Sequence, residues 1–298
     1  MRLQHKNHIR PCAQDYVFYS VNTLLMVLFT LIIAYPLLFV IFASFDGGAG
    51  TLSVNIWPSK WSDAGYRAVF EYGPVWIGYR NSLLYTVVGA LFGLIFCVCA
   101  AYPLAQPNLD GRNLFMGLFV FTMYFGGGLI PTFLVVNALH LYNTRAVMVL
   151  LYAFSMYNCI ICRTFFSSLP KEVEEAAIID GCTSFQVFWQ IVLPLSKALM
   201  GVMVLYFAVV HWNTYFAALI YLRDADKHPL QLVLRKILIL ETASDDMIGM
   251  EEAALAKLQL KELVKYAVII VSSLPVLILY PFLQKYFDQG VMIGSVKG

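Results

Sequence analysis

Residues 175–194 read EAAIIDGCTSFQVFWQIVLP and lie between two long apolar runs. Carboxylates and apolar residues at helical spacing on either side of a central glycine predict two short amphipathic helices joined by a turn. Such a segment cannot span a bilayer, and its charges would be costly against lipid. We therefore expect it to project from the membrane and to dock a soluble partner.

The composition around this segment is typical of a membrane protein. The chain has 298 residues, of which 60% are hydrophobic and only 13% are charged, whereas about a quarter of the residues of a soluble domain are charged. The formal net charge of +2 is too small to indicate nucleic acid or an acidic partner. The sequence predicts an all-α, polytopic protein of the lipid bilayer.

Charge-free apolar stretches predict six transmembrane helices, each near the length needed to cross hydrocarbon. They cover 21–45, 82–105, 114–136, 146–162, 198–222 and 266–283. The first stretch is too long for a signal peptide and lacks its small-residue cleavage site, so we expect it to remain as a span.

These spans divide the chain into a membrane domain, 21–284, between an N-terminal segment, 1–20, and a C-terminal tail, 285–298. The even number of spans puts both termini on one side, and the positions of Lys and Arg favour the cytoplasm. The loop 167–197 is then cytoplasmic, and the loops 46–81 and 223–265 are extracytoplasmic.

Gly126-Gly127-Gly128, followed by Pro131, interrupts the third stretch. These residues remove side-chain packing and a backbone donor, which predicts a bend or break in the helix. A broken helix in the membrane is tolerated where it lines a protein-enclosed cavity, so one interpretation is the wall of a pathway. The alternative is a close contact between helices at small residues.

The chain has six cysteines, at positions 12, 97, 99, 159, 162 and 182. Their positions do not predict a disulfide framework. Cys159 and Cys162 have the spacing of a redox or zinc motif, but no second ligand pair accompanies them. We expect inert, buried thiols and no metal site.

Several signals define the two helices of the segment. Pro170 suits a first helical turn, and the acidic residues Glu172, Glu174 and Glu175 complement the positive end of the helix dipole. Small apolar residues (Val173, Ala176, Ala177) follow on one stripe, and Gly181 after Asp180 predicts a left-handed stop. A second stripe comprises Phe185, Phe188, Trp189 and Val192, before Pro194 ends the helix. A pair of helices lying in the membrane interface would show the same pattern.

The full spacing resembles the EAA loop of the permeases of binding-protein-dependent ABC importers. The matching residues are Glu175, Ala176, Ala177, Asp180, Gly181, Ile191, Leu193 and Pro194. A second copy of the opening letters, Glu252-Ala253-Ala254, lacks the glycine and Leu-Pro at the required offsets and predicts a plain helical surface. The resemblance implies a type I importer permease (MetI-like) fold.

Further segments are similar to the maltose-permease-like sugar branch of that family, namely Trp212-Asn213, 281–287 and 290–298. The run 228–238 resembles the subgroup assigned to complex polysaccharides, including aldouronate and alginate-type oligosaccharides. Ser196-Lys197-Ala198 departs from the many relatives that have a proline after the lysine, and this departure affects helix entry more than docking.

The resemblance implies a transporter subunit of the bacterial cytoplasmic membrane and not an enzyme. The chain has no phosphate-binding loop of the Gly-x-x-x-x-Gly-Lys-Ser/Thr type, so ATP with Mg²⁺ would be used by two separate ATPase subunits and the chain would need no cofactor. The other partners would be a second permease, an extracytoplasmic solute-binding protein and an oligosaccharide. The coupling residues would be Glu174 together with the EAA positions above, and the tail from Gln284, unless it is a disordered terminus, would reach toward the ATPase.

Sugars are bound by polar groups and by stacking on aromatic faces. The candidates within the predicted spans are Tyr124, Gly127, His211, Trp212, Asn213 and Tyr215. Hydrogen bonding between helices is the alternative role for His211 and Asn213, and the partner permease could carry most of the sugar contacts. A metal or proton relay from His211 and Tyr215 to Asp224 and Asp226 would have no acidic residue within any span to support it.

Three alternative functions remain from the sequence. The permease could carry another class of solute. An ion-driven secondary carrier normally has intramembrane carboxylates and internal repeats, and neither is clear here. A membrane scaffold would keep the docking loop but would not need His211, Asn213 or the glycines at 126–128.

Overall fold

The computed structural model describes residues 12–47, 57–243, 260, 263–278 and 281. The chain forms two compact units, one of residues 1–69 and 248–270, and the other of residues 70–247 and 271–298. Within the described residues the regular structure is helical, with one isolated antiparallel bridge between Asp46 and Trp61. The expected all-α class is confirmed for this part of the chain.

The first unit contains α1, Ala13–Ala43, and most of α2, Ala64–Glu71. The side chains along α1 are largely exposed and apolar, as is expected of a helix that faces lipid or another subunit. After α1 the chain reverses: Ser62 donates a backbone hydrogen bond to the Phe45 carbonyl at 2.8 Å, and the Ser44 and Tyr66 hydroxyls are 2.7 Å apart.

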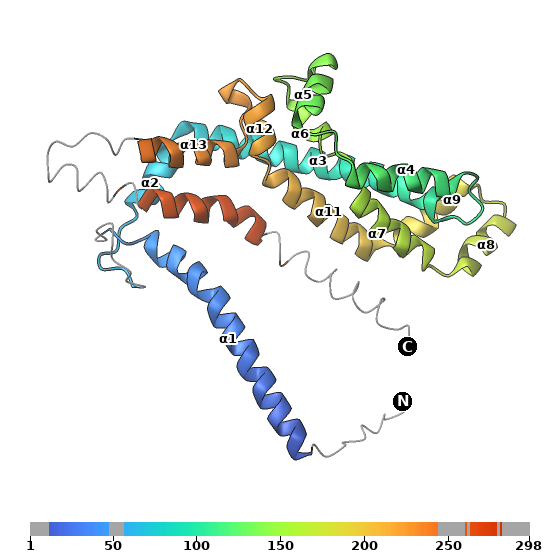
Figure 1. The fold of residues 1–298 in the computed structure, drawn as a ribbon, viewed down its shortest axis with the longest axis horizontal. Coiled ribbons are helices and arrows are strands. Elements are labelled where there is room, and N and C mark those ends of the chain that lie inside the picture. The colour runs from blue at the N-terminus through green and yellow to red at the C-terminus, as the bar shows by residue number, and fades with distance from the viewer. Residues whose placement is uncertain (1–11, 48–56, 244–259, 261–262, 279–280, 282–298) are drawn as a thin grey trace. The chain divides into compact units, whose positions relative to one another are not determined.

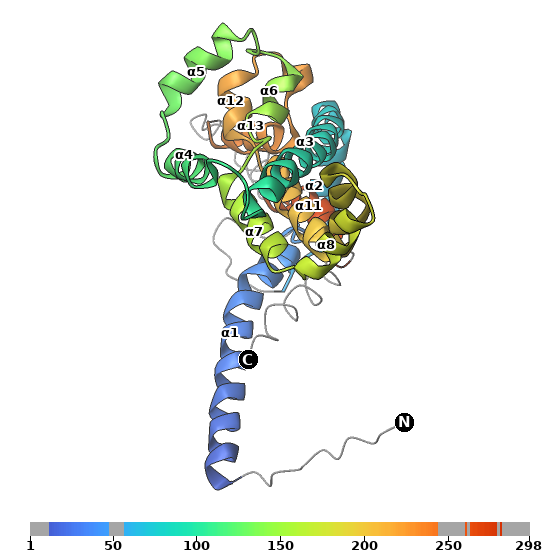
Figure 2. The ribbon, with the colours of Figure 1, turned by 90° about the vertical axis from the view of Figure 1, so that its right-hand side faces the viewer.

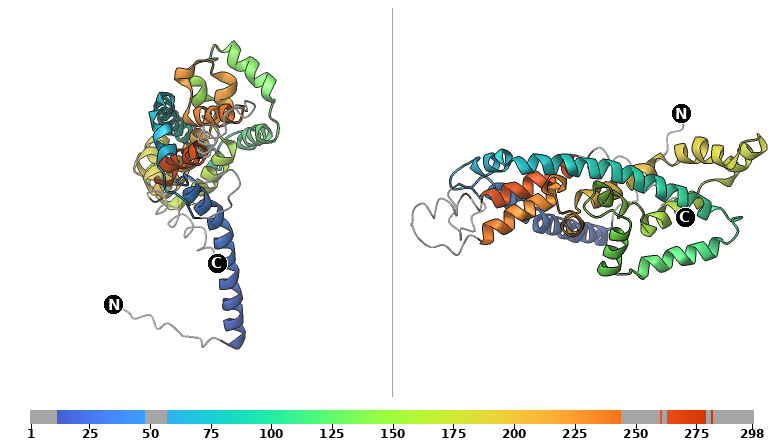
Figure 3. Two further views of the ribbon diagram at one scale, coloured as in Figure 1. Left: turned by 90° about the vertical axis from the view of Figure 1, so that its left-hand side faces the viewer. Right: turned by 90° about the horizontal axis from the view of Figure 1, so that it is seen from above.

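The second unit is organised around α3, Gly73–Ala105, a single helix of 33 residues. Figures 1 and 3 show α13 beside the Gly73 half of α3 and the short helices α8 and α9 near its other end. The remaining helices are α4 Arg112–Tyr124, α5 Leu129–Ala138, α6 Arg145–Leu150, α7 Met156–Ser167, α8 Lys171–Ile179, α9 Ser184–Val187, α10 Leu193–Leu195, α11 Lys197–Trp212, α12 Phe216–Tyr221 and α13 Leu230–Ala243. A π-helical turn, Phe188–Val192, joins α9 to α10, and a 3₁₀ turn, Ala225–Lys227, precedes α13.

Glycines let α11 approach α3 closely. A Cβ added at Gly89 would overlap the His211 ring, and one at Gly93 would overlap the Phe207 ring. The core between α3, α7 and α11 is completed by buried side chains such as Cys97, Cys162 and Met203. A second cluster, which includes Tyr85, Met148, Ala218 and Leu232, packs near the other half of α3.

Only some of the six predicted spans are uninterrupted helices. Among the described helices, Gln14–Ala43 and Gly73–Ala105 are each long and apolar enough to cross a membrane, and two bent pairs raise the number to four at most. The last apolar stretch is the shorter helix Leu263–Ile278. The helical class is therefore confirmed, but the count of six spans is not.

The interruptions have local causes. Thr214 donates its side-chain hydrogen bond to the His211 carbonyl and Asn213 donates to the Val209 carbonyl, so polar side chains compete with the helical ladder between α11 and α12. In the predicted span 146–162, Ser155 caps a new helix by accepting from the Asn158 amide. A hydropathy pattern does not record the hydrogen bonds that these short polar side chains make.

The break at the three glycines is confirmed. α4 ends at Tyr124 and α5 begins at Leu129 (Figure 2). The direction of the helix axis bends by 113° between them. An added Cβ at Gly126 or Gly128 would meet no atom within 4 Å. Among the described residues, therefore, no helix makes the close contact at these glycines that the alternative requires.

Candidate coupling site and pathway

The first half of the coupling loop is the helix α8. Pro170 precedes it and Glu172 and Glu174 lie in its first turn, where acidic side chains complement the helix dipole. Gly181 has φ +85°, the amide of Cys182 donates to the Ala177 carbonyl at 2.9 Å, and the amide of Gly181 donates to the Ile178 carbonyl at 3.0 Å. These two bonds form a Schellman motif, which requires a left-handed residue at Gly181. The predicted stop is confirmed.

The second half begins with a capping box. The Gln186 amide donates to the Thr183 hydroxyl, and the Thr183 amide donates to the Gln186 side chain at 2.8 Å. The π-helical turn then widens the helix just before Pro194, whose ring would clash with the carbonyl four residues back in an α-helix. The helix ends at Leu195, one residue beyond Pro194, and the direction of the helix axis bends by 82° between it and α11.

The residues that match the EAA pattern divide into two groups. Ala177 is buried, and Ile191 and Leu193 are half-buried against the core of α3, α7 and α11. The other matching residues are exposed at the surface of the described chain: Glu175, Ala176, Asp180, Gly181 and Pro194. One group therefore attaches the loop to its own unit, and the other is accessible to a partner.

Six large apolar side chains are also exposed on this loop, and four of them lie close to the turn at Gly181 in sequence. Ile178 and Ile179 extend from the end of α8, the latter with 84% of its surface exposed, and Phe185 and Trp189 stack on each other with parallel rings. The sequence places Phe185 and Trp189 on one stripe with Phe188 and Val192, but the structure buries only the latter two. The exposure of Phe185 and Trp189, together with the two isoleucines, supports a docking surface, because apolar side chains grouped on an exposed loop mark interaction sites.

Glu174 differs from Glu175 because it bonds within the unit. Its Oε2 accepts hydrogen bonds from the Gln106 side chain at 2.9 Å and from the Tyr102 hydroxyl at 3.2 Å. The Tyr102 ring also contacts Phe188 at 4.9 Å between centroids. Nothing in the sequence pattern marks Tyr102 or Gln106 as partners of the coupling loop, since they lie about 70 residues earlier.

A cavity of about 340 Å³ lies at the break between α4 and α5. The glycines at 126–128 line it together with three residues that carry hydroxyl groups, Thr132, Tyr152 and Tyr221. Its apolar lining comes from Leu129, Leu151, Phe216, Ala217 and Ile220. Aromatic faces beside a few polar groups suit a sugar.

Gly127 is the only one of the six predicted pathway residues among the cavity's lining residues. His211 is 1% exposed, and its Nδ1 lies 2.8 Å from the Phe207 carbonyl, while its Nε2 has no partner among the described residues. Its ring contacts Tyr152, which does line the cavity.

The other predicted pathway residues lie elsewhere. Trp212 is buried and donates to the Ser272 carbonyl at 3.0 Å, and Asn213 donates to the Val209 carbonyl of its own helix. Tyr124 is 79% exposed, and the Arg235 guanidinium lies 5.1 Å from the centre of the Tyr215 ring.

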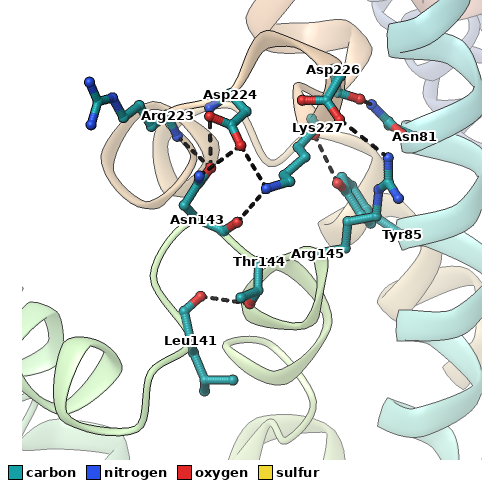
Figure 4. Close-up of polar contacts among 10 residues, drawn as sticks. All are labelled: Asn81, Tyr85, Leu141, Asn143, Thr144, Arg145, Arg223, Asp224, Asp226 and Lys227. Atoms are coloured by element: carbon teal, nitrogen blue, oxygen red, sulfur yellow. Dashed lines mark hydrogen bonds and ion pairs between the residues drawn. The ribbon is translucent and has the colours of Figure 1, made fainter.

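A polar cluster at the Gly73 half of α3 was not predicted from the sequence (Figure 4). Asn143, with φ +57°, accepts hydrogen bonds on its Oδ1 from the amides of Arg223 and Asp224, and its Nδ2 donates to the Asp224 carboxylate at 2.8 Å. The Lys227 ammonium donates to the same carboxylate and to the Asn143 carbonyl, each at 2.8 Å. Hydrogen bonding from Lys227, and then from Asn143, lowers the pKa of Asp224.

The same cluster is fixed to α3. Asn81 donates to the carbonyls of Asp226 and His228, Tyr85 donates to the Lys227 carbonyl at 2.8 Å, and the Ser82 hydroxyl accepts from the Leu230 amide at 2.9 Å. Burial, followed by the neighbouring charge of Lys236, lowers the pKa of His228.

The three cysteines of the core remain thiols. Cys97 and Cys162 have sulfurs 3.6 Å apart, and both are buried together with Cys159. In the part of the chain that the structure describes, no group of three metal-ligating side chains is found.

Comparison with known proteins identifies the family. Residues 13–293 match the family described as "Binding-protein-dependent transport system inner membrane component". The chain belongs to this family. The expected ABC permease identity is therefore confirmed, and the family is one of membrane components.

Among individual relatives, the Bacillus subtilis protein LplC is 41% identical over 88% of this chain and 89% of its own length. The "Polygalacturonan/rhamnogalacturonan transport system permease protein YtcP" of the same species is 39% identical over 92% of this chain and 96% of its own length. A chain of the crystal structure of "a bacterial ABC transporter involved in the import of the acidic polysaccharide alginate" superposes with a TM-score of 0.81 at 35% identity, covering 93% of this chain and 99% of that one.

Proposed function

We propose that this chain is a transmembrane subunit of an ATP-driven importer that passes an oligosaccharide from a solute-binding protein into the cytoplasm. The observation that carries the proposal is the coupling loop, a helix with a Schellman stop whose Glu175, Ile179 and Asp180 are exposed while Ala177 fixes it to the core. A partner that pulls on such a loop moves the packed helices with it, because interiors are close-packed.

The proposed assembly contains this permease, a second permease, two ATPase subunits that use ATP with Mg²⁺, and an extracytoplasmic binding protein. Six spans would put both termini and the coupling loop in the cytoplasm. The polar cluster at 223–230, which belongs to the loop 223–265, would then face outward. The cavity beside Gly127 would form part of the pathway, with Tyr152 and Tyr221 as the aromatic surfaces next to a sugar ring.

The proposed substrate is an oligosaccharide derived from a polysaccharide, and within this class we propose one that contains uronates. The names of YtcP and of the alginate importer support this class, since polygalacturonan and alginate are acidic polymers. Another solute handled by the same family is the second candidate.

Reconstitution of the complete complex in liposomes tests the proposal. We expect the loaded binding protein to stimulate ATP hydrolysis and labelled oligouronate to accumulate inside, with neutral oligosaccharides of the same length as the comparison. Uptake of neutral sugars alone would overturn the uronate assignment. Uptake driven by an ion gradient without ATP would overturn the importer and support a secondary carrier.

A further inference from the structure

We propose that Tyr102 and Gln106 are positioning residues that fix the coupling loop to α3 through Glu174, so that α3 transmits the loop's movement to the polar cluster at 223–230. The inference rests on the proposed function, because it describes how ATP-driven movement of the loop would reach the opposite end of the same unit. It assigns Glu174 to this internal contact, while Glu175 remains available to the ATPase.

The contact at the Ala105 end joins α3 to both halves of the coupling loop. Glu174 of α8 accepts hydrogen bonds from Tyr102 and Gln106, and hydrogen bonds to a carboxylate are stronger than neutral ones. The Tyr102 ring lies against Phe188 of the π-helical turn and against Phe166 of α7, with centroids 4.9 and 6.1 Å away. Movement of either half of the loop therefore acts on the same side chain of α3.

Between its ends α3 is suited to transmit movement. Its 33 residues correspond to a rod of about 50 Å at 1.5 Å per residue. After the first turn its only proline is Pro103, in the last turn. The length between the two contacts therefore contains no proline, and its glycines Gly89 and Gly93 are packed against α11. The Arg163 side chain donates to the Leu104 carbonyl at 3.0 Å, which satisfies a terminal carbonyl of the helix.

The contact at the other end is made by three side chains of α3. Asn81, Ser82 and Tyr85 bond to backbone groups of residues 226–230. Because these partners are backbone atoms, a shift or rotation of α3 displaces the chain itself and not only a side chain. The amide of Asn143 and the ammonium of Lys227 connect this segment in turn to the connection between α5 and α6.

The test compares variants in the reconstituted complex, with two measurements on each. The first is the amount of oligosaccharide imported per ATP hydrolysed. The second is the change in hydrogen exchange of the amides at 223–230 when vanadate traps the ATPase in its closed state. Tyr102→Phe removes the donor and keeps the ring, Glu174→Ala removes the acceptor, and Glu174→Gln retains an acceptor. Glu172→Ala is the matched control, since Glu172 is an exposed carboxylate in the same first turn.

We expect import per ATP to fall roughly two- to tenfold in Tyr102→Phe and in Glu174→Ala, because each change removes a hydrogen bond to the Glu174 carboxylate. The double variant should be no worse than Glu174→Ala, because that change already removes the hydrogen bond that Tyr102→Phe removes. Glu174→Gln should recover much of the loss, and Glu172→Ala should match the wild type. The vanadate-dependent change at 223–230 should shrink in the two impaired variants alone.

Equal import per ATP and an unchanged exchange response in Tyr102→Phe and Glu174→Ala would overturn the inference. Losses that add in the double variant would also overturn it, because they would show two separate roles. Failure of the proposed function is distinguishable, since it would appear as a wild-type complex without ATP-driven import.

Discussion

The coupling loop at the Ala105 end of α3 and the polar cluster nearer its Gly73 end are built in different ways. At the Ala105 end the shape of the coupling loop comes from bonds between residues two to five positions apart, such as Cys182 to Ala177 and Gln186 to Thr183. At the Gly73 end the polar cluster joins residues about 80 and about 145 positions apart, as in Asn143 with Asp224 and Asn81 with Asp226. A local structure can move as one body on a partner, whereas the cluster depends on the packing of three separate segments.

Disrupting the turn of the coupling loop should have the largest effect. Gly181→Val places a β-branched residue at φ +85°, which costs about 1–2 kcal/mol or more in a left-handed conformation. We expect ATP-driven import to fall roughly 5- to 30-fold, as measured by uptake into proteoliposomes. Gly117→Val is the matched control because Gly117 lies within α4 and its added Cβ meets no atom within 4 Å. Normal import by Gly181→Val would refute the rigid-turn explanation.

Disrupting the polar cluster should have a smaller effect, confined to the stability of the residues around it. Asn143→Ala removes three side-chain hydrogen bonds and puts alanine at φ +57°. We expect the opening free energy of the amides at 223–228 to fall by about 1–3 kcal/mol in hydrogen exchange.

Asn143→Gly separates the two contributions to this loss. It removes the same hydrogen bonds but tolerates a positive φ, so it should be less damaging than alanine by about 1 kcal/mol. Equal protection of 223–228 in both variants and in the wild type would show that the cluster does not depend on Asn143.

Low pH should destabilise the polar cluster, because it protonates His228. The Lys236 ammonium lies 3.1 Å from the Nδ1 of His228, so this nitrogen accepts a hydrogen bond and the ring is neutral. The pKa of His228 is lowered by burial and then by Lys236, while a hydrogen bond with the Leu222 backbone and the charges of Asp226 and Asp224 act in the opposite direction. A lowered pKa means that the unfolded chain binds the proton more readily, so stability is present above the ordinary value of about 6.5 and is lost as the pH falls below it.

We therefore expect faster exchange at 228–234 at pH 5.5 than at pH 7.5, after correction for the intrinsic rate. His228→Gln should reduce this pH dependence. Asp224, whose pKa is lowered by Lys227 and Asn143, should stay ionised over the same range. A pH response that survives in His228→Gln would assign it to another group.

The smallest effect should come from the exposed ion pair at the same end. Arg145 and Asp226 are 3.8 Å apart and about half exposed, and such pairs contribute about 0–1 kcal/mol. Arg145→Gln should change the opening free energy at 223–228 by less than Asn143→Ala does, and 0.5 M salt should have a similar small effect. A loss as large as that of Asn143→Ala would mean that charge, and not the amide network, holds the cluster.

The sequence by itself determined the elements whose cause is local. Pro170, Asp180 and Gly181 set the limits of α8 through propensity and the left-handed conformation, and Gly126-Gly127-Gly128 set the break before α5. The spacing of the EAA residues also identified the family that the comparison confirmed. The exact breaks at 151–155 and 213–215 were missed, because Ser155 and Thr214 act through side-chain hydrogen bonds that hydropathy does not record.

Only the tertiary structure decided which residues meet. It separated Glu174, bonded to Tyr102 and Gln106, from the exposed Glu175, although the two are adjacent identical residues. It also brought Asn143 to Asp224 and gathered the lining of the cavity from three separate segments. These contacts depend on the close packing of helices distant in the chain, and the periodicity of one helix carries no information about which helix it packs against.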